Sequence, residues 1–229
     1  MIIHSKNTVV LSDTHFPFQD NTAIKKALVS IIIYKPDLII LNGDIVDFYA
    51  LSKYSKKPSM CNLKNEIDTT KEFFKALRTK FKKRIIFKPG NHENRLCNYI
   101  LNHAAMFEGL TSLSLSSLLD LNKYGVEYAE DVIRVGDLNV IHGHESGNIC
   151  SAYPAKSLYL VAKTNCLAGH CHRQSSFVTR TICGDIIRTY TTGCLSILTP
   201  DYSKHNDWTH GIALIETHKG KSEVTLKSY

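Results

Sequence analysis

The 229-residue sequence contains no long apolar run and no recognisable leader segment. No stretch approaches the roughly 20 uncharged apolar residues that a helix needs to cross a bilayer. Residues 1–6 (MIIHSK) also lack the charged start and the apolar core of a signal peptide. We therefore expect a cytoplasmic location and no membrane partner.

The sequence also lacks a Cys-x-x-Cys pair, and its seven cysteines are odd in number. Both features argue against a disulfide framework and against a zinc ribbon. We expect free and mostly buried thiols, which is the common state of cysteine inside a protein. The cysteines are Cys61, Cys97, Cys150, Cys166, Cys171, Cys183 and Cys194.

Length and composition predict one compact domain spanning residues 1–229. The hydrophobic fraction of 43% is ordinary for a soluble globular protein, and the chain is long enough to bury a sizeable core.

The net charge of +7 is concentrated in one segment. Positions 53–88 carry twelve Lys or Arg residues against three acidic ones, so the rest of the chain is slightly acidic. A basic face of this kind attracts polyanions such as nucleotides or nucleic acid. A solvated, lysine-rich helix surface explains the same pattern equally well, and both interpretations stay open at this point.

Apolar runs of strand length alternate with segments of helical periodicity in the first ninety or so residues. Apolar residues recur at helical spacing over 21–34 and again over about 65–81. This alternation predicts an α/β fold with a largely parallel sheet and covering helices. After about position 126, short strands separated by Gly, Asn and Asp suggest a second, mostly antiparallel sheet packed on the first. The strand-length runs lie at 8–11, 38–41, 84–87, 138–141 and 166–168.

A motif rich in metal-ligand residue types follows each of these five runs. In open α/β sheets the carboxyl ends of the strands converge on one crevice, so residues far apart in sequence meet there. Each motif alone is a common accident, whereas all five, each directly after a strand, indicate one shared site. The motifs are Ser12-Asp13-Thr14-His15, Asn42-Gly43-Asp44-Ile45-Val46-Asp47, Gly90-Asn91-His92-Glu93, His142-Gly143-His144 and Gly169-His170-Cys171-His172.

The residue types fit a definite metal chemistry. Carboxylate, imidazole and amide oxygen together suit divalent ions such as Mn²⁺, Fe²⁺ or Zn²⁺, and there is no thiolate cluster. The alternating residues Asp13 and His15 point the same way from an extended segment, or are turned by a loop to flank one ion pair. Asp44 has two carboxylate oxygens and can bridge two ions.

The five blocks in this order resemble the calcineurin-like metallophosphoesterase superfamily. Its pattern is Asp-x-His, Gly-Asp-x-x-Asp, Gly-Asn-His-Asp/Glu, a later His, and Gly-His-x-His, and the matching blocks span residues 13–172. The Gly-Asn-His-Glu-Asn-Arg run and the small size are similar to stand-alone members from bacteria and bacteriophages, which would place the protein in the host cytoplasm. The resemblance implies a mixed α/β (α+β) fold with a two-sheet β-sandwich and flanking helices, in four αββα layers.

The resemblance also implies a role for each matched residue. Two divalent metal ions are the implied cofactors, with Mn²⁺ the first expectation and Fe²⁺, Zn²⁺ or Ni²⁺ the alternatives. His92 is implied to be the general acid rather than a ligand, and Asp47 to orient its imidazole. The implied metal ligands are Asp13, His15 and His172 for the first ion, Asn91, His142 and His170 for the second, and Asp44 as the bridge between them.

The implied reaction is hydrolysis of phosphomonoesters or phosphodiesters by in-line attack of a hydroxide shared between the two ions. Nucleotides and nucleic-acid ends are candidate substrates. Phe48 stands where the protein Ser/Thr phosphatases of the superfamily have a phosphate-binding arginine, so that activity is not expected. Arg95, His144 and Asn91 are the candidate substrate contacts, although Arg95 also fits a surface position and His144 a structural one.

Three other functions compete with this interpretation. A metal-dependent DNA or RNA nuclease uses the same centre, but such members usually carry additional domains. A non-catalytic scaffold on the same fold loses ligands, whereas every ligand position is filled here. A nucleic-acid-binding module that depends on positions 53–88 would bind in a salt-dependent manner without metals. The sequence names neither the substrate nor the oligomeric state.

Overall fold

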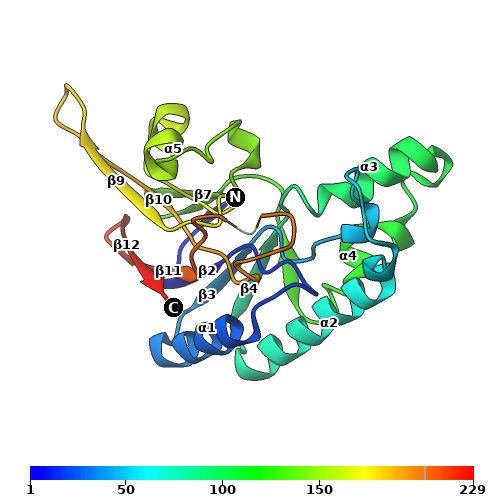
Figure 1. Ribbon diagram of the computed structural model, residues 1–229. Helices are drawn as coiled ribbons and strands as arrows, with labels where there is room; N and C mark the ends of the chain where they lie inside the picture. Colours follow the sequence, from blue (N-terminus) through cyan, green and yellow to red (C-terminus); the bar gives the residue numbers. More distant parts are fainter. Residues whose placement is uncertain (204) are drawn as a thin grey trace.

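Two six-stranded sheets form the centre of the structure, a computed structural model that describes residues 1–203 and 205–229. Figure 1 shows α1 and α2 on the outer side of one sheet and α5 on the outer side of the other. The first sheet has the order β12 (Lys221–Ser228), β11 (Gly211–His218), β2 (Asn7–Leu11), β3 (Leu38–Asn42), β4 (Arg84–Lys88) and β5 (Val126–Tyr128). The second has the order β1 (Ile2–Ile3), β6 (Ile133–Val135), β7 (Leu138–Ile141), β8 (Cys166–Ala168), β10 (Ile186–Thr191) and β9 (Ser175–Arg180).

The central strands of the first sheet are parallel, as the alternation of strands and helices predicts. β2, β3, β4 and β5 pair in parallel, and β11 and β12 extend the sheet in antiparallel fashion. Along β2, Val9 and Leu11 face the helices whereas Val10 faces the other sheet. Both faces of this strand are buried, which explains why the sequence shows a continuous apolar run instead of an alternating one.

Two long helices cover the first sheet close to their expected positions. α1 (Asn21–Tyr34) begins at Asp20, whose carboxylate accepts the N–H groups of Thr22 and Ala23, and it ends at Lys35 in the left-handed conformation. α2 (Leu63–Lys80) begins two residues before the expected start because Asn62 caps it. The shorter helices α3 (Asn94–His103) and α4 (Leu115–Leu118) follow β4.

The second sheet is mixed, so the expectation of a mostly antiparallel sheet is wrong. β6 with β7 and β9 with β10 are antiparallel, but β1 with β6, β7 with β8, and β8 with β10 are parallel. The helix α5 (Pro154–Ala162), which the periodicity analysis did not identify, lies between β7 and β8. A crossover helix of this kind returns the chain to the end of the sheet where β7 begins, so β8 runs parallel to β7.

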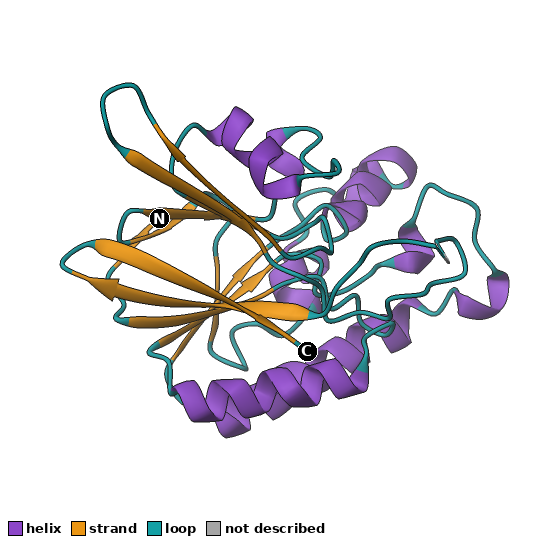
Figure 2. Ribbon diagram, turned by 60° about the vertical axis from the view of Figure 1, so that its left-hand side comes forward, coloured by secondary structure: helices purple, strands orange, loops and turns teal. Residues whose placement is uncertain are grey.

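Three buried clusters separate four layers, and the expected αββα architecture is confirmed. One cluster lies between α1, α2 and the first sheet, one between the two sheets, and one between the second sheet and α5. Figure 2 shows the two sheets between the helices. In the described part of the chain, no helix combines the length and apolar character needed for a membrane crossing.

Five of the seven cysteines are free, as expected, but the expectation is wrong for one pair and for burial. Cys150 and Cys171 form a disulfide with their Cα atoms 5.0 Å apart, and Cys61, Cys97 and Cys183 are exposed. Cys150 follows β7 and Cys171 follows β8. Because these two strands are parallel neighbours, their following loops lie at the same end of the sheet. The two cysteines are close because of the order of strands in the sheet, and their spacing in the sequence does not reveal it.

Candidate metal centre

The five motifs lie together at the carboxyl ends of β2, β3, β4, β7 and β8. Contacts between their side chains join loops that are far apart in sequence. His15 Nε2 and His172 Nε2 are 3.0 Å apart, and Asp44 Oδ2 lies 3.3 Å from His142 Nε2. The loops that follow these five strands therefore meet at one place in the structure.

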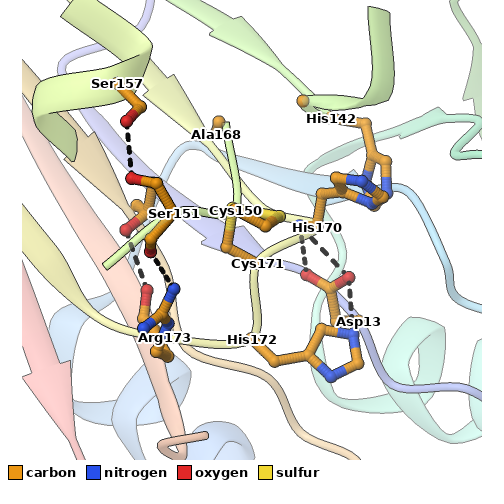
Figure 3. Close-up of a disulfide and its surroundings, with 12 residues drawn as sticks. Asp13, His142, Cys150, Ser151, Ser157, Ala168, His170, Cys171, His172 and Arg173 are labelled. Carbon is orange, nitrogen blue, oxygen red and sulfur yellow. Dashed lines mark hydrogen bonds and ion pairs between the residues drawn. A yellow bond between two sulfur atoms is a disulfide. The ribbon is translucent and has the colours of Figure 1, made fainter. Parts of the chain in front are cut away.

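A first group of candidate ligands consists of Asp13, His15 and His172. One ligand atom from each lies within 4.8 Å of the others, and all three residues are buried. His172 Nε2 is 3.3 Å from Asp13 Oδ1, and Asp13 also accepts the backbone N–H of His170 at 2.9 Å (Figure 3). Two imidazoles beside one buried carboxylate form a donor set suited to a divalent cation.

A second group consists of Asp44, His142 and His170, again with ligand atoms within 4.8 Å of one another. The His142 Nδ1–H donates to the carbonyl of Asn42 at 2.7 Å, which leaves the Nε2 lone pair directed at Asp44. A backbone acceptor on the distal ring nitrogen is the usual way to fix the tautomer of a metal-binding histidine. His15 Nε2 is 3.8 Å from Asp44 Oδ2, so Asp44 borders both groups.

Five of these residues have a backbone conformation that is rare for residues other than glycine. Their φ angles are positive: 55° at Asp13, 51° at His15, 52° at Asp44, 67° at His170 and 55° at His172. The alternating pairs are therefore turned by loops and do not project from extended segments. Left-handed non-glycine residues are costly and cluster at functional sites, where the surrounding structure holds them in place.

Gly43 shows how closely the loops are packed. Its φ is +81°, and a Cβ at this position would lie 2.3 Å from His142 Nδ1. Both the backbone conformation and the missing side chain are therefore required where the loop after β3 passes His142.

His92, Asp47 and Arg95 form a connected group at the edge of the centre. The His92 Nδ1–H donates to the Asp47 carbonyl at 2.9 Å, and Asp47 Oδ2 lies 2.9 Å from His15 Nδ1. Arg95 donates to the Asp47 carbonyl at 3.0 Å and lies 3.0 Å from His92 Nε2. Arg95 thus lies against the two residues expected to act in catalysis, which excludes the alternative of an isolated surface residue.

The charged groups at this centre shift one another's pKa values. Burial by itself raises the pKa of Asp13, but the adjacent His172 outweighs it and lowers the pKa to about 2. Burial lowers the pKa of His142, but the Asp44 and Asp13 carboxylates outweigh it and raise the pKa to about 10. For His92, burial is likewise outweighed by Asp44 and Asp47, and the net pKa is raised. The buried carboxylates therefore require nearby positive charge.

Glu93 holds the centre together, and the sequence analysis gave it no role. Its buried carboxylate accepts four backbone N–H groups at distances between 2.7 and 3.1 Å. Three of these donors belong to the loop after β3, and the fourth belongs to Gly90 after β4. Glu93 is the last residue of the Gly90-Asn91-His92-Glu93 motif, but its role as an acceptor of backbone N–H groups depends on how the loops fold. The donors are Asp44, Ile45, Val46 and Gly90.

His144 lies beside the second ligand group, 5.4 Å from the His142 ring and 6.5 Å from the His170 ring between centroids. Its Nε2 contacts the Asn94 amide at 3.2 Å. The following residue, Glu145, pairs with the buried Lys88 at 2.9 Å and accepts the N–H of Gly143 at 2.7 Å. This ion pair ties the loop that carries His142 to the end of β4.

The donor set passes a test of fit for metal ions. Among the described residues, Asn91 Oδ1 and His142 Nε2 are buried and have no hydrogen-bond partner. Buried polar atoms are almost always paired, and a divalent cation would supply the partner that these two acceptors lack. The family implies divalent metals, and the residues present fit them.

Comparison with known proteins gives the same classification. The calcineurin-like phosphoesterase family profile matches residues 6–174. The Gene 54 proteins of Mycobacterium phages L5 and D29 are 28% and 29% identical to the chain over 179 residues, which is 74% of this chain and 70% of each of theirs. Vps29 of Chaetomium thermophilum is 10% identical with a TM-score of 0.48, covering 97% of this chain and 96% of that one. Vacuolar Protein Sorting 29 of Cryptosporidium parvum is 13% identical with a TM-score of 0.46, covering 98% of both chains. The profile match shows that the chain belongs to the calcineurin-like phosphoesterase family.

Proposed function

We propose that the protein is a binuclear metal-dependent hydrolase of phosphate esters. The observation that carries this proposal is the pair of adjacent ligand groups, Asp13/His15/His172 and Asp44/His142/His170, with Asp44 at their border. Asn91, whose buried amide oxygen has no hydrogen-bond partner, would complete the second group. Mn²⁺ is the first candidate for both positions, with Fe²⁺, Zn²⁺ and Ni²⁺ as alternatives that the same donors accept.

Divalent ions held in these two groups would polarise the phosphoryl group and lower the pKa of water. Asp44 would keep the two ligand groups in one unit through its two carboxylate oxygens. If Asp44 serves both groups, the first group has a second carboxylate in Asp13 and the second group does not. The second group would then be the less negative one and the better place for a bound phosphate. These residues supply position and charge, and no covalent intermediate with the protein is needed.

His92 would donate the proton that the leaving oxygen requires. Its Nδ1–H is committed to the Asp47 carbonyl, so Nε2, which Arg95 contacts, is the nitrogen that would face a substrate. The Asp44 and Asp47 carboxylates raise the pKa of His92 against the effect of burial, which favours the protonated form that a general acid needs. Arg95, 3.0 Å from Nε2, would bind a phosphoryl oxygen beside it.

The proposed substrates are phosphomonoesters or phosphodiesters, with nucleotides and nucleic-acid ends among them. The basic segment 53–88 gives little support for a surface that binds nucleic acid. Eight of its twelve basic side chains contact an acidic side chain or a backbone carbonyl. This pattern favours the solvated helix surface over the binding face, and the proposal therefore rests on the metal centre alone.

The test measures Mn²⁺-dependent hydrolysis of a nitrophenyl phosphomonoester beside the bis-ester, followed by mononucleotides, cyclic nucleotides and single-stranded DNA. We expect Asp44→Asn to weaken Mn²⁺ binding. We expect His92→Ala to retain Mn²⁺ and to lose at least about a hundredfold in rate. His103→Ala, at an exposed histidine on α3, is the matched control and should behave as wild type. Equal activity of all four proteins would refute the assignment, and Mn²⁺ binding without any hydrolysis would favour the scaffold.

A further inference from the structure

The Cys150–Cys171 disulfide lies directly behind the candidate metal ligands. Cys171 is the residue between His170 and His172 in the loop that joins β8 to β9. Figure 3 shows the bridge on the side of this loop opposite Asp13, toward Ser151 and Ser157. One of the flanking histidines belongs to each ligand group, so this single loop serves both groups.

The loop needs an external restraint to hold its conformation. His170 and His172 both have positive φ angles, 67° and 55°, which non-glycine residues adopt only when the surroundings impose it. The loop restrains itself with a hydrogen bond from the Cys171 N–H to the Gly169 carbonyl at 2.7 Å. The Cys171 side chain is buried, and the disulfide is its covalent connection to the rest of the fold.

The other end of the bridge is firmly anchored. Ile149, which precedes Cys150, is fully buried and packs in the cluster between the second sheet and α5. Ser151, which follows Cys150, contacts Ser157 of α5, and their hydroxyl oxygens are 2.6 Å apart. Arg173 also donates a hydrogen bond to the Ser151 carbonyl, so the two loops are joined on both sides of His172, by the disulfide before it and by this hydrogen bond after it.

We infer that Cys150 and Cys171 are positioning residues whose disulfide fixes His170 and His172 for metal binding, and that its reduction releases both ligand groups. The inference rests on the ligand assignment of the proposed function. Cys150 is exposed, so a reductant can reach the bridge from solvent. The metal affinity of the protein would then follow the thiol–disulfide state of its surroundings.

The redox step is an ordinary exchange with a dithiol. A thiolate of the dithiol attacks the Cys150 sulfur, the bond to Cys171 breaks, and the Cys171 thiolate takes up a proton. The second thiol of the reductant then displaces Cys150, which leaves two protein thiols and one cyclic disulfide of the oxidised reductant. The bridge gains two electrons and two protons, and the metal ligands themselves are not oxidised or reduced.

The experiment titrates Mn²⁺ into oxidised protein and into protein reduced with a dithiol and desalted under argon. Peptide mass spectrometry establishes the state of the bridge, and calorimetry measures the affinity. Loss of a group that orients metal ligands typically weakens metal binding about ten- to hundredfold, and we expect a loss of this size on reduction. Amide hydrogen exchange over residues 168–174 should accelerate in the same sample.

Cys150→Ser should reproduce the reduced state without any reductant, because it removes the exposed partner and leaves buried Cys171 in place. Cys183→Ser, at an exposed free cysteine between β9 and β10, is the matched control and should respond to the dithiol as wild type does. Thermal unfolding of the metal-free proteins separates an effect of the bridge on fold stability from an effect on metal binding. A bridge that only stabilises the fold would lower the unfolding temperature and leave the Mn²⁺ affinity unchanged at temperatures where all variants are folded.

Equal Mn²⁺ affinity of the oxidised and reduced proteins, or the absence of the bridge in the oxidised sample, would overturn the inference and leave the proposed function standing. Redox-dependent Mn²⁺ binding without hydrolysis of any phosphate ester would uphold the inference and overturn the proposed function. Failure of the oxidised protein to bind Mn²⁺ would overturn both.

Discussion

The backbone N–H of Asp44 donates a hydrogen bond to Glu93 Oε2 at 2.9 Å, so a side chain that follows β4 fixes the loop that follows β3. The same carboxylate accepts three further N–H groups. A second hydrogen bond joins the same two loops, because the backbone N–H of His92 donates to Asp44 Oδ1 at 2.9 Å. Two neighbouring strand ends are thereby locked in one register, with the candidate bridging ligand between them.

Glu93→Ala should be strongly destabilising although Glu93 contacts no substrate. It would leave four buried N–H groups without an acceptor, and such groups cost about 1–3 kcal/mol each when they stay dry. Partial hydration reduces the expected loss to about 4 kcal/mol in the free energy of unfolding, measured in urea without metal. Glu93→Gln keeps one acceptor oxygen and should lose less. Glu72→Ala, at an exposed glutamate on α2, should stay within about 0.5 kcal/mol of wild type.

The convergence of the five motifs could be predicted because it follows from a general property of parallel strands. Each motif begins where an apolar run ends, and the carboxyl ends of neighbouring strands share one edge. The grouping of Asp13 with His172, 159 positions apart, came from the resemblance to the calcineurin-like superfamily, and the structure places His172 Nε2 3.3 Å from Asp13 Oδ1. The residue types and the strand ends therefore predicted that the motifs meet, whereas the role of each residue at the centre stays a prediction.

The backbone contacts of Glu93 and the Cys150–Cys171 bridge could not be predicted in the same way. Glu93 binds N–H groups, which every residue carries, so no sequence pattern identifies its partners. The disulfide depends on β7 and β8 being parallel neighbours, and that pairing depends on α5, a helix of only nine residues. Short helices and strand order are decided by tertiary packing more than by local periodicity.

The buried pair Lys88–Glu145 should matter for both stability and the His142 loop. Lys88 is 2% exposed and lies 2.9 Å from Glu145 Oε1. Lys88→Met would leave the carboxylate without its cation, and breaking a buried pair typically costs about 3–5 kcal/mol. Glu145 remains partly hydrated, so we expect about 2 kcal/mol by urea unfolding. The double variant with Glu145→Gln should be more stable than the sum of the two single losses predicts. Additive losses would show that the two side chains do not interact.

Arg95 should act in turnover more than in metal binding. Its guanidinium contacts the Asp47 carbonyl at 3.0 Å and lies 3.0 Å from His92 Nε2. Arg95→Ala should lower kcat about ten- to hundredfold while Mn²⁺ affinity stays near wild type. Arg95→Lys should recover little of this loss, because a single ammonium group cannot make both contacts in the same geometry. Recovery of wild-type kcat in Arg95→Lys would show that only the positive charge matters.

Glu66 should make the stability of the protein decrease as the pH rises from about 4.5 to 7. Its carboxylate is buried beneath the segment after Asp47 and accepts the N–H groups of Tyr49 at 2.7 Å and Ala50 at 3.0 Å. Burial raises its pKa from 4.5 to about 7. The folded state therefore holds a proton that the unfolded state has released, and stability falls as the pH rises from about 4.5 to 7.

Comparison of wild type with Glu66→Gln across this pH range isolates the effect. The glutamine loses one of the two backbone acceptors, which costs the same at every pH. Wild type should therefore have the higher free energy of unfolding at pH 5. This difference from the variant should shrink by about 2 kcal/mol by pH 8 once solvent screening is allowed for. Urea unfolding at each pH measures the difference. An advantage that stays constant with pH would mean that Glu66 is ionised throughout, and that its two backbone hydrogen bonds outweigh the burial of its charge.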